Sequence, residues 1–413
     1  MALPTEPDLP LADLKILDFS WVGVGPITVK YLADHGATVV RVESHARLDV
    51  VRLGPPWHDA KPGIERSQFY ASYNTSKYGI ALDLGRPEAR AIARKLAAWA
   101  DVVVESFTPR VMRDWSLAYD DLRRLNPRLV MLSTCLQGQT GPHALFPGFG
   151  QLMAALSGFY EISGWPDRSP APPYGAYTDF IVPRLAATAL LAAIDHQRRT
   201  GEGQHLDVSQ FEASLHFLAP ALIEFALTGA VATRNGNRAE HAAPHGVYPC
   251  AGEGADPDRW IALSVRGTAE WRAFCAVLGR PEWGEDTRFA THADRVAAAD
   301  ALDTLIMEAT RTEDGRALMD RLQAAGVAAG VVQSALDLHA DPVLAGWGFF
   351  EWLEHPERPP APYEGHALRL EATPGRLRRA APALGEHTAL VLKEVLGFSE
   401  EEVARLIEEK IAW

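Results

Sequence analysis

The chain has 413 residues, of which 47% are hydrophobic and 23% are charged, and its formal net charge at pH 7 is −13. A single hydrophobic core rarely serves a chain longer than about 300 residues, so we expect two domains. The acidic balance argues against a nucleic-acid partner, because phosphate backbones are bound by basic surfaces. A net negative charge is still compatible with a local basic pocket that binds a smaller anion.

Compartment signals in the sequence point to the cytoplasm. The three cysteines, Cys135, Cys250 and Cys275, have no CxxC spacing, which predicts a reducing environment without a disulfide framework. The N-terminus lacks a basic segment followed by an apolar stretch, so we predict no signal peptide. The most apolar window, residues 185–194, has charged residues on both sides and is too short to span a bilayer. We therefore expect a cytoplasmic protein without a membrane partner.

The first half of the chain alternates strand patterns with helix patterns. Residues 14–20 and 37–43 are typical of buried strands, and residues 27–36 between them have a helical pattern that a glycine ends. Later strands are expected at 79–84, 101–107, 127–136 and 204–210, and later helices at 86–100, 116–126, 147–158 and 182–200. Such alternation predicts an α/β fold, with a mostly parallel sheet and helices on both of its faces.

The character of the sequence changes in the second half. Residues 227–250 are rich in glycine, asparagine and charge, which is typical of a linker. A strand pattern at 259–265 and several helical runs then indicate a smaller α+β module, and two further helical runs follow near the end of the chain. The predicted parts are a large domain at 1–228, a small domain at 229–335 and a C-terminal segment at 336–413.

A loop with two glycines, residues 20–26, connects the first predicted strand to the first helix. Glycines there let a ligand phosphate approach the backbone, and a helix N-terminus favours negative charge. Glu43 ends the next strand, where a dinucleotide site places its ribose-binding acid. The fingerprint fails at Thr28, which occupies the third glycine position, and at Pro26, which lacks a backbone donor. We therefore expect a phosphate-bearing ligand other than NAD, with a tight turn that binds no ligand as the alternative.

A single carboxylate, Asp179, lies among aromatic and aliphatic residues just before an alanine-rich helical run. One interpretation is structural, because Asp is a favoured N-cap and Pro183 would then fall in the first turn, where N–H groups lack partners. The other is functional, because a carboxylate at a helix N-terminus stays ionised while apolar neighbours exclude the water that would blunt it as a nucleophile. Position alone leaves both interpretations open, and they are compatible.

Other reaction centres receive little support from the residues. His143, His196 and His387 stand apart from one another, without HExxH or Cys/His ligand spacing, so we predict no metal site. Each is more typical of a packing or surface residue than of a catalytic one. The absence of a GxSxG motif weakens an α/β-hydrolase interpretation.

Eight segments occur in one order along the chain: LKILDFSWVGVGPITVKYLADHGATVVRVE, NTSKYGIALDL, DVVVESFTPRVM, LNPRLVMLS, GQTGP, RRTGEGQHLDVS, RFATHADRV and APALGEHT. Together they resemble the family III CoA-transferases, which include formyl-CoA and carnitine CoA-transferases and the related α-methylacyl-CoA racemase. The likeness covers almost the whole chain. No single segment is diagnostic, but eight in order are specific.

The resemblance implies a Rossmann-like large domain, a smaller α+β domain and a C-terminal segment that returns to the large one. It also implies an interlocked homodimer with the active site between large and small domains. The family's catalytic aspartate matches Asp179, which favours the nucleophile interpretation. The implied reaction moves CoA from an acyl-CoA thioester to a free carboxylic acid through a mixed anhydride and then an aspartyl-CoA thioester. Coenzyme A thioester is then a substrate, and no tightly bound cofactor is expected.

The family's CoA contacts match this chain unevenly. Ser44 follows Glu43 where formyl-CoA transferase has arginine, and Asp114 occupies the place of another expected arginine, with Arg113 beside it. Leu136 and Gln137 also replace the commoner residues of a pocket loop. The positions that match CoA contacts are Trp21, Val22, Gly23 and Val24 in the first loop, Ser106 and the stacking residue Phe107, the basic residues Arg52 and Lys77 for the phosphates, and Gln137 and Gly138.

An acyl-CoA racemase or epimerase on the same fold is the main alternative. Such enzymes pair the aspartate with a histidine, and one group removes the α-proton while the other returns one. The matching position is Phe149, which cannot shuttle protons. An intramolecular CoA-transfer isomerase is a further alternative, whereas retention of Asp179 argues against an inactive subunit. The aromatic residues Trp21, Phe149, Tyr174 and Tyr177 suggest a pocket for a bulky acyl group, and analogy with the family suggests succinate as a donor acid.

Overall fold

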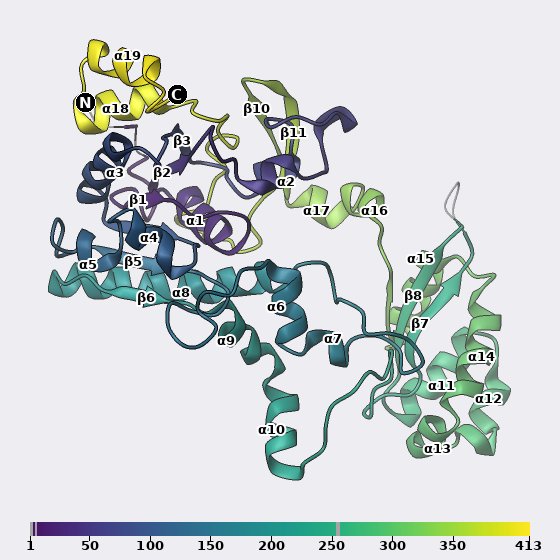
Figure 1. Ribbon diagram of the computed structural model, residues 1–413. Helices are drawn as coiled ribbons and strands as arrows, with labels where there is room; N and C mark the ends of the chain where they lie inside the picture. The colour runs from purple at the N-terminus through teal and green to yellow at the C-terminus, as the bar shows by residue number, and fades with distance from the viewer. Residues whose placement is uncertain (1–2, 5, 253–256) are drawn as a thin grey trace. The chain divides into compact units, whose positions relative to one another are not determined.

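The computed structural model describes residues 3–4, 6–252 and 257–413 (Figure 1). The chain divides into two compact units. Unit 1 comprises Met1–Glu161, Pro172–Ala232 and Ala345–Trp413, and unit 2 comprises Ile162–Ala171 and Thr233–Leu344. Unit 1 therefore takes in segments from both halves of the chain.

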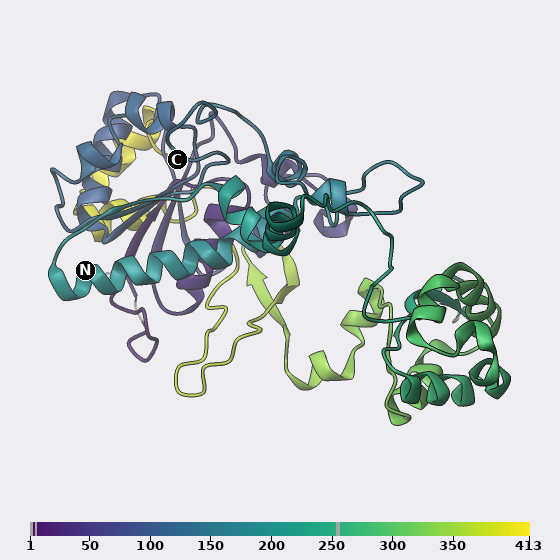
Figure 2. The ribbon, with the colours of Figure 1, turned by 90° about the horizontal axis from the view of Figure 1, so that it is seen from below.

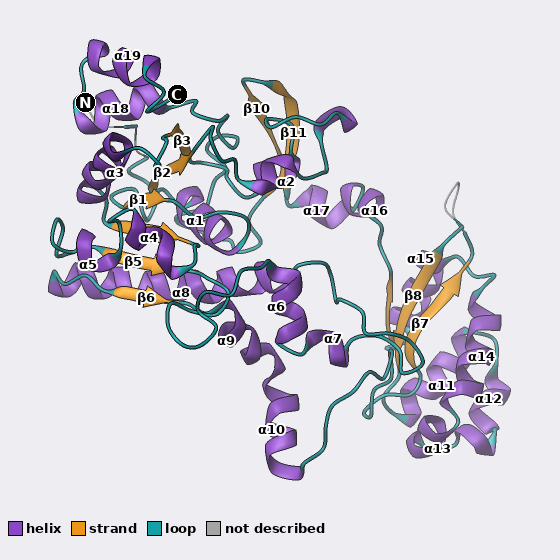
Figure 3. Cartoon of the chain, in the orientation of Figure 1, coloured by secondary structure: helices purple, strands orange, loops and turns teal. Residues whose placement is uncertain are grey.

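A six-stranded parallel sheet forms the centre of unit 1 (Figure 3). Its strand order, β3-β2-β1-β4-β5-β6, is that of doubly wound nucleotide-binding folds. Apart from β6 and the first residue of β1, the strands are buried, because helices cover both faces of the sheet. The predicted mixed α/β fold with a mostly parallel sheet is confirmed. The strands are β1 Lys15–Asp18, β2 Thr38–Glu43, β3 Tyr78–Ala81, β4 Val102–Glu105, β5 Val130–Ser133 and β6 His205–Asp207.

Alternate side chains of these strands contribute to two separate cores. Leu17 and Val40 pack with one group of helices, and their neighbours Ile16 and Val39 pack with the other. Figure 2 shows the sheet between these two helical layers. The first layer contains α3 (Pro87–Trp99), α18 (Thr388–Leu396) and α19 (Glu400–Glu408), and the second contains α1 (Val24–Asp34) and α8 (Tyr177–Thr200).

The C-terminal helices attach to the edge strand β3. The Gly79 N–H donates to Nδ1 of His387 at 3.2 Å, and the Ala81 N–H donates to Oγ1 of Thr388 at 3.0 Å. His387 therefore has a structural role at the junction with α18. A hairpin of β10 (Phe350–His355) and β11 (Arg358–Glu364) precedes this segment in unit 1.

Unit 2 is built on a three-stranded antiparallel sheet of order β7-β8-β9. Trp271, Phe274, Phe289 and Ile306 are buried in its core, against the inward side chains of the sheet. Its strands are β7 His245–Cys250, β8 Arg259–Ser264 and β9 Ala328–Val331, and its helices include α11 Thr268–Val277, α12 Pro281–Glu285, α13 His292–Ala297, α14 Ala299–Thr310, α15 Gly315–Ala324 and α16 Ala335–His339.

Two helical stretches are apolar and long enough to cross a bilayer by length and composition, Tyr177–Thr200 and Gln210–Thr228. The first is α8, which is longer than the apolar window at 185–194, and half of its apolar window is buried within the molecule. Core helices of soluble proteins have the same properties, so these stretches are weak evidence for a membrane. The remaining helices are α2 Gln68–Ser72, α4 Pro109–Asp114, α5 Tyr119–Leu122, α6 Gly150–Leu156, α7 Phe159–Ile162, α9 Gln210–Leu215, α10 Ala219–Thr228 and α17 Pro342–Gly346.

The start of α8 differs from the prediction that Asp179 is the N-cap of this helix. The N-cap is Ala176, so Asp179 is the third residue of the helix rather than its cap. Pro183 lies inside the helix, not in its first turn. Because proline has no N–H, Pro183 cannot donate the usual helical hydrogen bond to the Asp179 carbonyl oxygen. The carboxylate of Asp179 is therefore not needed to cap this helix.

Candidate functional site

The site lies where the strand order of the parallel sheet reverses, between β1 and β4. The loop after β1 and the loop after β4 meet there, since the Trp21 N–H donates to Oγ of Ser106 at 2.8 Å. Ligands of open α/β sheets bind at such points, outside the carboxyl ends of the strands. The first turn of α8 brings Asp179 to the same place.

Two glycines lie directly against the Asp179 side chain. A Cβ atom on Gly23 would be 2.8 Å from Cβ of Asp179, and one on Gly150 would be 2.4 Å from its Oδ2. Both distances are far shorter than a van der Waals contact. The glycine loop at 20–26 and the start of α6 therefore leave space for this carboxylate and for no further side chain.

Asp179 itself is a buried carboxylate with few hydrogen-bond donors. Only 8% of the residue is exposed, and burial raises its pKa to about 6. The amide Nε2 of Gln210 donates to its Oδ1 at 2.6 Å, and this bond and one from the Gly150 N–H act against the increase. The carboxylate is thus ionised at neutral pH yet poorly hydrated, which is the condition for a reactive nucleophile.

The loop that supports Asp179 contains a strained residue. Val22 has a φ angle of 64°, a left-handed conformation that β-branched residues rarely adopt. Its N–H lies 3.2 Å from a carboxylate oxygen of Asp49, and Asp49 in turn accepts from Nη2 of Arg41 at 2.6 Å. Strained backbone of this kind concentrates at functional sites, because surrounding contacts must hold it in place.

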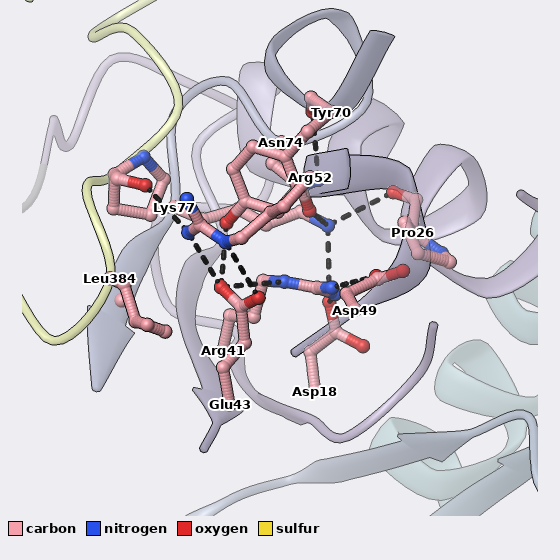
Figure 4. A network of polar contacts seen from close by, with 12 residues as sticks. Asp18, Pro26, Arg41, Glu43, Asp49, Arg52, Tyr70, Asn74, Lys77 and Leu384 are labelled. Atoms are coloured by element: carbon pink, nitrogen blue, oxygen red, sulfur yellow. Dashed lines mark hydrogen bonds and ion pairs between the residues drawn. The ribbon is translucent and has the colours of Figure 1, made fainter. Parts of the chain in front are cut away.

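A buried ion network beneath this loop supplies those contacts (Figure 4). Arg41 is fully buried and donates to the Ser20 carbonyl at 2.6 Å, and it also pairs with Asp49 and Asp18. Burial alone would lower the pKa of this guanidinium, but the surrounding carboxylates, Glu43 first, raise it instead. The network therefore positions residues 20–22 through charges that no solvent reaches.

Arg52 and Lys77 belong to this network, which differs from their expected role at CoA phosphates. Arg52 makes two hydrogen bonds to Glu43, at 2.9 and 2.8 Å, and a third to Glu65 at 2.8 Å. Lys77 uses its three donors on Asp18, on Asn74 and on a backbone carbonyl, at 2.9 to 3.0 Å. Both side chains are fully buried, so neither cation is open to a ligand.

Three cavities adjoin the site. Asp179 lines both a cavity of about 160 Å³ and another of about 410 Å³. A third cavity, of about 680 Å³, shares the residues Trp21, Ser106, Phe107 and Phe149 with the first and extends across the carboxyl ends of β2, β3 and β4. The Asp179 carboxylate thus adjoins two cavities, which is the arrangement expected of a group that reacts with two substrates.

The structure gathers most, but not all, of the residues predicted to bind CoA. Nε2 of Gln137 lies 4.0 Å from Sδ of Met153, and Gly138 is buried in the loop after β5. Neither lines the cavities that adjoin Asp179. Those that line the smaller cavity with Asp179 are Trp21, Val22, Gly23, Val24, Ser106 and Phe107.

Three residues that contact the site are not among those predicted from the sequence: Gln210, Gly150 and Asp49. Gln210 follows β6 and begins α9, so its place after a parallel strand was a usable signal. Gly150 begins the helix that was predicted over 147–158, but nothing in the sequence shows that a carboxylate lies against it. Asp49 carried no signal, because its partners come from separate segments of the chain.

The histidines considered in the sequence do not line the cavities beside Asp179 in the described part of the chain. Phe149, which the resemblance matches to the racemase histidine, lines all three cavities. Within residues 3–4, 6–252 and 257–413, His, Cys, Asp and Glu form no group of three or more that could hold a metal ion. Asp179 is the carboxylate that lines the cavities of about 160 and 410 Å³.

Comparisons with known proteins show which family the chain is similar to. A family model described as CoA-transferase family III matches residues 11–388. Succinyl-CoA–D-citramalate CoA-transferase of Chloroflexus aurantiacus is 30% identical over 408 residues, which cover 98% of this chain and 99% of that protein. Succinate–glutarate CoA-transferase of Agrobacterium fabrum is 33% identical over 388 residues, which cover 94% and 96%.

The fold comparison gives the same result. The crystal structure of a CAIB/BAIF family protein from Brucella suis has a TM-score of 0.85 and 28% sequence identity, and the match covers 94% of this chain and 99% of that one. The named relatives move CoA between acids, which supports the same class of activity here. The chain belongs to CoA-transferase family III.

Proposed function

We propose that the protein transfers CoA from an acyl-CoA thioester to a free carboxylic acid, with Asp179 as a covalent nucleophile. One observation carries this proposal: a buried carboxylate adjoins two cavities and is held by a short hydrogen bond from Gln210. The family, whose named members are CoA-transferases, supports the same reaction class.

Each step of the proposed reaction exchanges one acyl bond for another. Asp179 attacks the thioester carbonyl, so that CoA leaves as a thiolate and a mixed anhydride forms. The thiolate then attacks the Asp179 carbonyl carbon, which releases the first acid and leaves an aspartyl-CoA thioester. The second acid attacks that thioester, which expels the CoA thiolate and forms a second mixed anhydride. The thiolate then attacks the carbonyl carbon of the second acid, which releases the Asp179 carboxylate and gives the new acyl-CoA. Covalent catalysis divides one difficult transfer into easier steps, but water would hydrolyse every intermediate.

The cavities suggest where the substrates bind. We assign the large cavity and the smaller one that shares its lining to CoA, with Trp21, Val22, Gly23, Val24, Ser106 and Phe107 as contacts. The cavity of about 410 Å³ is assigned to the acid, and its lining is largely apolar, with Val51, Phe69, Tyr174 and Phe180. The relatives named above are succinate or succinyl-CoA enzymes, so we propose succinyl-CoA as a donor and a bulky apolar acid as an acceptor.

Arg47 is the cationic side chain among the residues that line the large cavity. Its guanidinium lies over the Trp21 ring at 5.6 Å from the centroid, and we propose it as the CoA phosphate contact in place of Arg52 and Lys77. Arg47→Ala should raise KM for the acyl-CoA roughly tenfold, the size of one charge-assisted hydrogen bond, with little change in kcat.

Steady-state kinetics at several salt concentrations test this assignment, because a phosphate contact weakens as salt is added. Arg124→Ala is the matched control. This exposed arginine precedes β5 and so lies toward the amino ends of the strands, whereas the site lies at their carboxyl ends. Equal KM values for the Arg47 and Arg124 variants would remove Arg47 from the phosphate site.

We further propose an interlocked homodimer of chains with the domain limits 1–228, 229–335 and 336–413. The compact units differ from these limits in that residues 162–171 and 336–344 belong to unit 2 and residues 229–232 to unit 1. The exposed apolar side chains of α10, which include Leu222, Ile223, Phe225 and Leu227, support a partner surface on unit 1. Light scattering should give twice the chain mass of 45.1 kDa. Leu222→Glu combined with Phe225→Glu should shift the protein toward monomer, and a monomeric wild-type protein would contradict the proposal.

A racemase remains the second candidate on this fold. It needs a second proton carrier beside Asp179. The residue that the resemblance matches to the racemase histidine is Phe149, which lines both cavities and cannot carry a proton. Deuterium uptake at the α-carbon in heavy water without an acceptor acid would favour the racemase over the transferase.

Trapping of the intermediate tests the proposed function. The enzyme is incubated with succinyl-CoA and hydroxylamine and then digested for mass spectrometry. Asp179 should be recovered as the hydroxamate, because hydroxylamine cleaves an aspartyl thioester or anhydride but not a free carboxylate. A peptide that stays unmodified while CoA transfer proceeds would exclude the covalent route.

A further inference from the structure

Gln210 is a buried amide whose donors converge on the site. It is the first residue of α9, is 2% exposed and lines the smaller cavity together with Asp179. Its Nε2 donates to Oδ1 of Asp179 at 2.6 Å and to Oγ1 of Thr178 at 2.8 Å. Because a buried amide is costly unless it is hydrogen-bonded, this placement requires both acceptors.

The neighbouring hydroxyl fixes the orientation of the amide. Thr178 has a single hydroxyl proton, which it donates to the Gly150 carbonyl at 3.0 Å. Its oxygen can therefore only accept from Gln210, so the amide nitrogen rather than the amide oxygen faces Thr178 and Asp179. Both N–H bonds of this nitrogen are then in use, and one of them is directed at the carboxylate.

We propose that Gln210 is a catalytic hydrogen-bond donor that positions the Asp179 carboxylate and stabilises the oxyanion formed when the aspartyl carbonyl is attacked. This inference rests on the proposed function. It assigns a catalytic role to a side chain on α9 that is not among the site residues predicted from the sequence.

The chemistry places negative charge at the atom that Gln210 contacts. When the CoA thiolate attacks Cγ of the anhydride, a C–S bond forms and the carbonyl electron pair moves onto the oxygen beside Gln210. Collapse of this tetrahedral centre breaks the C–O bond to the first acid, which leaves as a carboxylate, and no proton is transferred. Attack by the second acid on the aspartyl thioester generates the same oxyanion. A donor already in place needs no rearrangement as this charge develops.

Gln210→Leu is the first test, because it removes the donor and keeps a similar volume. We expect kcat to fall about 100-fold with little change in KM for the acyl-CoA, as for other oxyanion donors. The acid limb of the rate profile, which we expect near pH 6 in the wild-type enzyme, should move to higher pH, since the hydrogen bond holds the pKa of Asp179 down. Hydroxamate formation at Asp179 should slow by the same factor.

Gln210→Glu provides a readout that a structural role would not change. A protonated glutamic acid can still donate to Asp179, whereas an ionised one repels it. The variant should therefore be more active than Gln210→Leu below pH 6 and less active at pH 8, so that the two profiles cross. Gln197→Leu is the control: Gln197 is equally buried and donates to the Arg128 carbonyl at 2.8 Å, about five turns along α8 from Asp179.

Three outcomes separate the possibilities. Crossed profiles, with an unchanged profile for Gln197→Leu, support the role of Gln210. Parallel profiles, or Gln210→Leu with wild-type kcat and wild-type hydroxamate formation, overturn this role and leave the nucleophile intact. A wild-type enzyme that forms no Asp179 hydroxamate overturns the proposed function and, with it, this inference.

Discussion

Replacement of Asp179 by asparagine is expected to lower kcat by more than about 10⁴-fold, because an amide cannot form the anhydride. The same change should stabilise the protein at pH 8. The amide introduced by Asp179→Asn keeps the shape of the side chain and an acceptor oxygen for Gln210, so the effect on activity does not come from a lost fold.

The gain in stability follows from the raised pKa of Asp179. Between its unfolded value of 3.8 and its folded value of about 6, the folded protein holds a proton that the unfolded chain has lost. Stability therefore falls as pH rises through this window, and at pH 8 the ionised carboxylate costs about 3 kcal/mol. Thermal melts of both proteins at pH 4 and pH 8 measure this: the advantage of Asp179→Asn should appear at pH 8 and shrink toward pH 4. A variant that keeps a tenth of the activity, or that melts earlier at pH 8, would contradict a buried nucleophile.

Gly150→Ala is expected to lower kcat by about 100-fold or more. The added methyl group would lie 2.4 Å from Oδ2 of Asp179, so the carboxylate must move by about 1 Å, and misplacement of this size costs about two orders of magnitude. The backbone at Gly150 has an ordinary negative φ angle, so the effect comes from the contact and not from backbone strain.

Gly330→Ala is the matched control for this prediction. Gly330 lies in β9, and nothing comes within 4 Å of the Cβ that would be added there. We expect its kcat within twofold of the wild-type value. Equal activity of the two variants, measured with succinyl-CoA and the preferred acceptor acid, would show that Asp179 does not react from the position observed here.

The parallel sheet could be predicted from the sequence because its strands, apart from β6, are short, mostly apolar and buried on both faces. Residues 37–43, for example, could only be a buried strand, and they form β2 at Thr38–Glu43. The first helix is predicted at 27–36 but begins at Val24. Pro26 lies in its first turn, where N–H groups have no helical partner, so the missing N–H of proline does not prevent the helix from starting there. Local patterns thus fix the existence of elements better than their ends.

The site was less predictable because its contacts join distant segments. The apolar neighbours of Asp179 mark it as a candidate, and the family resemblance favours its role as nucleophile, whereas its donor Gln210 lies 31 residues away on another element. Arg52 and Lys77 had the charge expected of phosphate ligands, but carboxylates from β1, β2 and Glu65 close on them in the fold. The sequence shows that a side chain is basic, but it does not show which group that side chain pairs with in the fold.

Transfer of oxygen from the acceptor acid to Asp179 is the most direct measurement of the central claim. If the acceptor attacks the aspartyl thioester and CoA then attacks the acceptor's carbonyl, one acceptor oxygen stays on Asp179. After one turnover with a doubly ¹⁸O-labelled acceptor, we expect the peptide that contains Asp179 to gain about 2 Da, and the same peptide without acyl-CoA to gain nothing. An unlabelled peptide after complete CoA transfer would show that the two acids exchange CoA without a bond to Asp179.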